Sequence, residues 1–211
     1  VSAVVVLYKD HPLASLRFAQ SRGVPHLSIS SGIFEIAPEI ASFMHAPTAS
    51  AIVLGYEWLV GATTVPALHL AKSFSQVEEI RIGALVDKHD TGGPAVAADF
   101  EHLNHLLPAA LTRRDGSWIW REGDDANAVF AALDGTEINA TGFSSIDVTG
   151  LAAATGARSV QFNLGQGVSS SRRKGGALST EIVLDMSGLD HGGQTICIRH
   201  VVVHPGGAAP L

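Results

Sequence analysis

The fold is decided by residues 2–30, which read SAVVVLYKDHPLASLRFAQSRGVPHLSIS. Residues 2–8 form an apolar run rich in β-branched valine, which is typical of a strand buried on both faces of a parallel sheet. Residues 13–22 have one apolar helical face, and Gly23 supplies the C-terminal stop. Residues 24–30 follow as a second short strand. The order strand, helix, strand predicts a βαβ unit whose crossover is right-handed.

This unit cannot stand alone as a parallel sheet. Two parallel strands do not cover their own faces, and Val1 already lies almost inside the first strand. We therefore expect further strands to precede Val1 or to come from another chain. The sequence is interpreted as the C-terminal part of a longer protein, whose remaining part carries the opening strands of a doubly wound sheet.

Composition limits the class of protein. Hydrophobic residues make up 46% and charged residues 16%, which excludes a disordered chain. The formal net charge of −6 argues against a nucleic-acid partner. No apolar stretch has the length of a membrane span, so no membrane partner is expected. The single cysteine, Cys197, excludes an internal disulfide and favours a reducing, cytoplasmic location. The composition, rich in alanine and glycine and poor in lysine, is typical of a GC-rich bacterial genome.

The pattern changes along the chain from helices and buried strands to hairpins and alternating strands. In the first part we expect helices over 38–45, 59–75 and 94–107, and strands over 49–55 and 77–87. Asp115-Gly116 and Asp134-Gly135 predict hairpin turns, and Gly156 ends a short helix over 146–155. The last third contains alternating strands that predict an antiparallel sheet, at residues 160–164, 181–186 and 196–201.

The expected fold class is therefore α/β. Residues 1–36 would be the closing βαβ piece of a doubly wound parallel sheet, the C-terminal piece of a Rossmann-type domain. Residues 37–211 would form an α+β domain with a mostly antiparallel sheet, serving substrate binding and dimerisation.

Three segments carry a resemblance to a known family: Ser28 to Glu35, Ser144 to Ala157, and Thr180 to Ile182. Together they resemble bacterial NAD(P)-dependent oxidoreductases of the saccharopine dehydrogenase-like group. The resemblance implies an N-terminal Rossmann domain that binds NAD or NADP, and a second domain that closes over it and forms a homodimer through its antiparallel sheet. The family's glycine-rich phosphate loop and ribose-binding acid are not in these 211 residues. This chain alone should therefore bind a dinucleotide weakly or not at all.

Ligands of open α/β sheets bind outside the carboxyl ends of the strands. Here that rule indicates Tyr8 and Lys9 after the first strand, and Ser30 and Ser31 after the second, as cofactor-binding residues that face the nicotinamide. The alternative is purely structural: Asp10 caps the helix, Ser31 belongs to a turn and Lys9 is a surface charge.

Ionisable groups gather at the end of the strand over 77–87. Lys88 and His89 are the candidate catalytic residues, since a histidine beside carboxylates can act as a general acid or base. Asp87 is a candidate substrate-binding residue, and its alternative is a polar turn.

Arg172 and Arg173 are candidate substrate-binding residues in a basic loop, which is otherwise a solvated hairpin loop. The preceding Gly165-Gln166-Gly167 is rejected as a dinucleotide loop, because that fingerprint needs a helix behind it.

The chain's ten histidines do not predict a metal site. His102 and His105 share a helix face, and His200 and His204 share a strand face, but neither pair has a third ligand at a fixed spacing. Cys197 lies in an alternating strand and is interpreted as a small packed side chain.

Two classes of function remain open. The first is the C-terminal part of an oxidoreductase, which transfers a hydride between a nicotinamide and a small, amino-acid-like substrate. The alternative is a non-catalytic dimerisation or assembly domain. A third class of function is a small-molecule binding module that uses Arg172 and Arg173.

Overall fold

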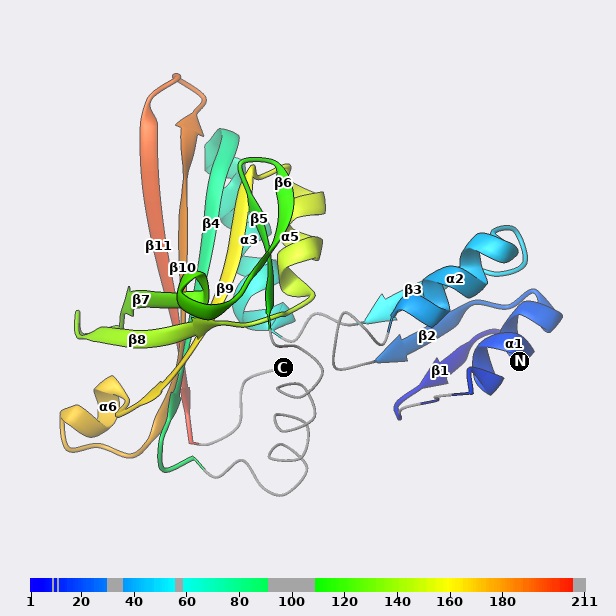
Figure 1. Ribbon diagram of the computed structural model, residues 1–211, viewed down its shortest axis with the longest axis horizontal. Coiled ribbons are helices and arrows are strands. Elements are labelled where there is room, and N and C mark those ends of the chain that lie inside the picture. The colour runs from blue at the N-terminus through cyan, green and yellow to red at the C-terminus, as the bar shows by residue number, and fades with distance from the viewer. Residues whose placement is uncertain (9, 11, 30–35, 56–58, 91–108, 207–211) are drawn as a thin grey trace. The chain divides into compact units, whose positions relative to one another are not determined.

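The computed structural model describes residues 1–8, 10, 12–29, 36–55, 59–90 and 109–206. It divides into two compact units, Val1–Tyr56 and Glu57–Leu211, which are described in turn (Figure 1). The helix expected over 94–107 lies outside the described residues. The mixed α/β fold class is confirmed, because one unit has a parallel sheet and the other a larger, mostly antiparallel sheet.

The first unit is a three-stranded parallel sheet in the order β1-β2-β3. Its elements alternate strictly along the chain: β1 (Val4–Val6), α1 (Ala14–Arg22), β2 (His26–Ile29), α2 (Ala37–His45) and β3 (Ile52–Gly55). Gly23 ends α1 with a φ of 63°, a left-handed conformation that costs glycine nothing. The predicted βαβ unit is therefore present, and it is extended by a further helix and strand.

Both helices cover one face of this sheet. Ser15 of α1 contacts the side chain of His26, which places α1 over the face that also holds Val6. Gln20 and Ser42 exchange two hydrogen bonds between α1 and α2. The opposite face carries the cross-strand row Val5, Leu27 and Val53, and none of the helices described in this unit lies over it.

One expectation for this unit needs correction. The boundary expected near residue 36 lies inside the unit, which extends to Tyr56 because β3 pairs in parallel with β2. The first strand, which the sequence predicts to be interior to a wider sheet, is an edge strand among the described residues, and Val5 is 60% exposed there. A run of valines is as compatible with an edge as with an interior strand, because β propensity does not count neighbours.

The second unit is an eight-stranded sheet in the order β11-β10-β4-β9-β5-β6, with β8 also pairing with β9 and β7 with β8. Only β4 and β9 of these neighbours run parallel. The strands are β4 (Phe74–Asp87), β5 (Ala110–Arg114), β6 (Ser117–Arg121), β7 (Asn127–Ala131), β8 (Glu137–Gly142), β9 (Ser159–Gly167), β10 (Ser179–Asp190) and β11 (Thr195–Pro205).

The helical segments of this unit are shorter than its strands. They are η1 (Val60–Thr64), α3 (Val65–Leu70), η2 (Ala71–Ser73), η3 (Gly123–Ala126), α5 (Asp147–Thr155) and α6 (Ser170–Arg173). The single long helix expected over 59–75 is wrong in detail: it is a π-helical turn, an α-helix and a 3₁₀ turn in sequence. Pro66, which has no N–H to donate, lies at the change from π to α.

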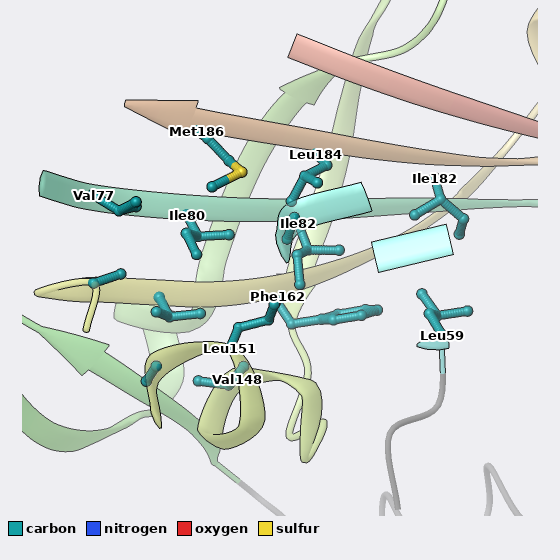
Figure 2. Close-up of a cluster of buried hydrophobic side chains, with 14 of the residues drawn as sticks. Leu59, Val77, Ile80, Ile82, Val148, Leu151, Phe162, Ile182, Leu184 and Met186 are labelled. Carbon is teal, nitrogen blue, oxygen red and sulfur yellow. The ribbon is translucent and has the colours of Figure 1, made fainter. Parts of the chain in front are cut away.

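The core packs one face of the large sheet against α3 and α5 (Figure 2). Alternate residues of three neighbouring strands supply it, and all are at most 1% exposed: Ile80, Ile82, Phe162, Ile182, Leu184 and Met186. The alternation predicted for β4, with Ile80 and Ile82 inward and Arg81 outward, is therefore confirmed. Leu59 and Val148 close this cluster from the helical side.

The described residues cover the opposite face of the sheet only partly. The β7–β8 hairpin lies across it, as Figure 1 shows, and Phe130 packs over Gly83. A Cβ added at Gly83 would come within 2.6 Å of the Phe130 ring, so this approach requires glycine. Beyond the hairpin the face carries polar side chains, among them Arg81 and Asp185, which are cross-strand partners.

Both predicted hairpin turns are present. Asp115 and Gly116 have φ values of 51° and 85°, the left-handed pair that a two-residue hairpin needs. Gly135 has a φ of 85° between β7 and β8. The positions of turns were readable from sequence because few residues tolerate these angles.

Candidate functional site

The polar cluster at the carboxyl end of β4 is built on Asp87, whose side chain is fully buried. Its Oδ1 accepts from the backbone N–H of His89 at 2.9 Å and from Nη1 of Arg172. Its Oδ2 accepts from the backbone N–H of Ser169 at 2.8 Å and from the Ser169 hydroxyl at 2.7 Å. Four donors therefore occupy this carboxylate.

These donors keep Asp87 ionised. Burial by itself raises the pKa of the carboxyl, but the hydrogen bonds from His89, Ser169 and Arg172 outweigh it and hold the pKa well below its ordinary value. A buried carboxylate with this many donors is a fixed anion, because protonating it would break several bonds at once. Asp87 therefore cannot exchange a proton near neutral pH.

A second buried carboxylate, Glu181 of β10, repeats the arrangement one residue further along the loop. It accepts from the backbone N–H and hydroxyl of Ser170, and from the backbone N–H of Leu133 at 2.9 Å. Arg173 donates to the Ser170 hydroxyl at 2.9 Å and holds Asp134 through two bonds of 2.7 Å. That bidentate pair keeps the pKa of Asp134 well below its ordinary value.

The structure thus brings together four residues singled out from sequence: Asp87, His89, Arg172 and Arg173. A helix after the Gly165–Gly167 stretch, which we expected to be missing, is present as the single turn α6. The backbone N–H groups that lead into α6, those of Ser169 and Ser170, already donate to Asp87 and Glu181. These two backbone N–H groups are therefore not available to an external anion.

Two groups of this cluster still face outward. His89 is exposed, and its Nε2 lies 3.4 Å from Nη2 of Arg172. Lys88 is also exposed, while its backbone N–H donates to the carbonyl of Gly167 at 2.7 Å. An arginine fixed by a buried aspartate and placed beside a histidine can hold an anion while the histidine moves a proton.

The predicted cofactor-binding residues fall at the edges of the described structure. Tyr8 follows β1 and is 65% exposed. Lys9, Ser30 and Ser31 lie outside the described residues. The nearby amino terminus of α1 is not open to a phosphate, since Asp10 Oδ2 accepts from the Ser15 backbone N–H at 2.7 Å and from its hydroxyl.

Comparison with known proteins gives only distant likenesses. No protein-family model matches the chain, and no curated protein is similar to it in sequence. Among solved structures, saccharopine dehydrogenase (L-Glu forming) from Saccharomyces cerevisiae has a TM-score of 0.49 and 13% identity, over 96% of this chain and 70% of that one. The WlbA (WbpB) dehydrogenase from Thermus thermophilus, solved with NAD and α-ketoglutarate, has a TM-score of 0.39 and 16% identity, over 94% and 60%.

A dehydrogenase (MviM) from Clostridium difficile is similar at the same level, with a TM-score of 0.41 and 8% identity over 98% of this chain. The neighbours are oxidoreductases. This chain spans about three fifths of the length of two of them, 63% and 60%. Likeness at this level does not identify the family, and the saccharopine dehydrogenase-like group stays a prediction.

Sequence reasoning missed a buried polar relay in the first unit. His26 is 1% exposed, and its Nε2 lies 3.1 Å from the Ser15 hydroxyl, which donates to Asp10. Burial lowers the pKa of His26, although the Asp10 carboxylate acts in the opposite direction. Asp10, predicted to be the N-cap, does accept a hydrogen bond from a helix amide, that of Ser15. The N-cap position itself is Leu13, three residues after Asp10.

Sequence reasoning also gave no role to Asp147, which lies in a segment quoted for the family resemblance. Its Oδ1 accepts from the Leu59 backbone N–H at 3.2 Å and from the Thr63 hydroxyl at 3.0 Å, and the Ser145 hydroxyl donates to Oδ2. These contacts tie α5 to η1 inside the core. A buried structural carboxylate looks the same in sequence as a helix cap, which is why the pattern did not reveal it.

Two further findings concern the described residues alone. No three histidine, cysteine, aspartate or glutamate side chains there are grouped as a metal ion would require. None of the helices there combines the length and the apolar character needed to cross a bilayer.

Proposed function

We propose that this chain is part of an NAD(P)-dependent oxidoreductase, in which Val1–Tyr56 closes the dinucleotide-binding sheet and Glu57–Leu211 carries the substrate. The observation behind it is the incomplete parallel sheet of the first unit. Parallel sheets occur almost only with both faces covered by helices, whereas α1 and α2 both lie on one face here. The exposed valines of the other face, Val5 at 60% and Val53 at 49%, are where further helices of a doubly wound sheet would pack.

The free edge of β1 supports the same proposal. The backbone N–H of Val4 donates to the carbonyl of Pro25 at 2.8 Å, on the side of β2. Because successive N–H groups of a strand point in opposite directions, that of Val5 points to the outer edge. Among the described residues no strand pairs with this edge. In the proposed enzyme, earlier strands of the dinucleotide-binding sheet pair there.

The residues at the carboxyl ends of β1 and β2 would then meet the cofactor. We assign Tyr8, Lys9, Ser30 and Ser31 to the nicotinamide half of NAD or NADP. The diphosphate must bind elsewhere, because Asp10 already occupies the amino terminus of α1. When bound, the nicotinamide supplies the hydride chemistry, and the protein's task is to place a substrate against it.

In the second unit we assign Arg172 to a carboxylate of the substrate and His89 to proton transfer, with Lys88 as a neighbouring cation. Asp87 acts as a positioning residue, since its four bonds fix Arg172 and the backbone of His89. Arg173 supports the loop through Asp134. The substrate class that suits this set is a small, amino-acid-like molecule.

One observation favours the alternative, a non-catalytic assembly domain. Arg172 and Arg173 both have carboxylate partners, so the loop offers little uncompensated positive charge. The outer strand β11, eleven residues long, pairs only with β10 among the described strands. We propose that the protein forms a homodimer through this antiparallel sheet in either case.

Dinucleotide binding separates the two functions. The protein expressed from the complete gene is titrated into NADPH and NADH while nicotinamide fluorescence is followed, with this 211-residue chain as the matched control. The oxidoreductase proposal predicts a saturable change for the complete protein and little or none for the chain alone. No response from the complete protein would overturn it and leave the assembly domain.

A further inference from the structure

A small cavity lies on the face of the large sheet that the β7–β8 hairpin partly covers. Its volume is about 210 Å³, and it is lined by polar residues of β4, β9 and β10 on one side and by β7 on the other. Arg81, Gln161 and Asp185 stand in one cross-strand row beneath it. Phe130 and Ala128 of β7 supply an apolar wall.

The polar groups of this cavity keep unused bonding capacity. Asn163 is 4% exposed, and its Oδ1 accepts from Nη2 of Arg121 at 2.9 Å. That bond fixes the orientation of the amide, because a guanidinium is only a donor. The Asn163 Nδ2 therefore carries two donors that have no acceptor among the described residues. These two N–H donors are therefore available to a ligand in the cavity.

The two charged residues of the row are not paired with each other. Arg81 reaches Glu79 only at 3.6 Å, and Asp185 reaches Arg199 only at 3.8 Å. Arg199 is engaged elsewhere, since its guanidinium donates to the carbonyl of Ala131 in the hairpin. A guanidinium and a carboxylate are thus cross-strand neighbours, and each can bind a further group of opposite charge.

We propose that this cavity binds a small zwitterion, an α-amino acid with a short apolar side chain. Arg81 takes the carboxylate, Asp185 takes the ammonium, and the amides of Asn163 and Gln161 donate to the carboxylate oxygens. The ammonium and the carboxylate of an α-amino acid are attached to the same carbon atom. These neighbouring opposite charges match those of Arg81 and Asp185, which face each other on adjacent strands. The apolar side chain lies against Phe130, and the volume of about 210 Å³ suits a ligand of this size.

This site is separate from the Asp87 cluster and does not depend on the proposed oxidoreductase activity. Arg81 and Asp87 lie six residues apart on β4, a separation of about 20 Å along an extended strand. Phe130 of the hairpin packs over the strand between them, at Gly83. The ligand therefore acts as a second small molecule and not as the substrate of the cluster.

The test uses L-valine as the probe and ¹⁵N-labelled protein. Valine should shift the side-chain amide signals of Asn163 and Gln161 in a saturable way. Valinamide, which lacks the carboxylate, and isovalerate, which lacks the ammonium, should bind at least about tenfold more weakly. These comparisons use the wild-type protein, so they do not depend on whether a variant folds.

Variants then assign the charges. Arg81→Gln and Asp185→Asn should each weaken valine binding by at least about tenfold. The matched control is Arg114→Gln, which changes an exposed arginine that pairs with Asp125 at 3.0 Å outside the cavity, and it should bind like the wild type. The proposal is overturned if isovalerate binds as well as valine, if valine moves signals elsewhere but not those of Asn163 and Gln161, or if no saturable shift occurs.

Discussion

Arg121 of β6 donates a hydrogen bond of 2.9 Å from Nη2 to Oδ1 of Asn163 on β9, two strands away. The same guanidinium donates to the carbonyl of Phe162 at 3.2 Å and to the Thr112 hydroxyl at 2.8 Å. It fills a fork in the sheet, because β9 pairs with β5 at Val160 but with β8 from Asn163 onward. Burial lowers the pKa of this arginine, which is 2% exposed.

We expect Arg121→Ala to reduce the free energy of unfolding by about 3 kcal/mol, because three acceptors around the fork would lose a charged donor. Urea unfolding of the intact chain measures the loss. Arg114→Ala, which removes only an exposed ion pair with Asp125, should cost less than about 1 kcal/mol. Equal losses for the two variants would show that the fork does not depend on Arg121.

Gly83→Ala should displace the β7–β8 hairpin and cost about 2 kcal/mol, since the new Cβ would approach the Phe130 ring within 2.6 Å. The reason is tested by a double-mutant cycle in urea unfolding. In a Phe130→Ala background the same glycine substitution should cost much less. A cost that is unchanged in that background would mean that the clash lies elsewhere.

Asp87→Asn should lower stability by about 3 kcal/mol at neutral pH, because it leaves the half-buried Arg172 without its counter-ion. The pKa of Asp87 is depressed in the folded state, so the carboxylate stabilises the protein above its unfolded pKa of 3.8. That contribution is lost as the pH falls below 3.8 toward the folded value. Acid unfolding followed by circular dichroism should accordingly be less steep in this window for Asp87→Asn. A wild-type slope in the variant would contradict the assignment.

His26 should make the first unit less stable in mild acid. Its folded pKa is lowered from 6.5, so the neutral form is favoured in the fold, and the stabilising contribution is present above 6.5 and lost as the pH falls below it. Hydrogen exchange of the α1 amides, corrected for intrinsic rates, should therefore lose protection between about pH 7.5 and about pH 5.5. His26→Gln should remove this dependence, whereas His45→Gln, an exposed histidine of the same unit, should retain it.

Much of the fold was predictable because it follows from local sequence patterns. The turns at Gly116 and Gly135 require positive φ, and the alternation of Ile80 and Ile82 with Arg81 requires a sheet with one buried face. For the candidate site, the sequence predicted which residues belong to it but not how they contact one another. Sequence placed Asp87 and Arg172 among the candidates, but their bond joins residues 85 positions apart, which no periodicity reports.

Other features could not be predicted, for equally physical reasons. The valine run of β1 does not distinguish an edge strand from an interior strand, because valine suits both. The expected long helix changes from π to α next to Pro66, which has no N–H to donate. The hydrogen bonds of Leu59 and Thr63 to Asp147 join residues 88 and 84 positions apart, a separation that no local pattern reports.

The central claim is that β1 belongs inside a wider dinucleotide-binding sheet, and the backbone N–H of Val5 tests it most directly. Its hydrogen exchange should be measured in the protein expressed from the complete gene and in this 211-residue chain. The account predicts strong protection of this one amide in the complete protein and rapid exchange in the chain alone, where the edge is free. Rapid exchange of the Val5 amide in both proteins, beside a protected Val4 amide, would contradict it.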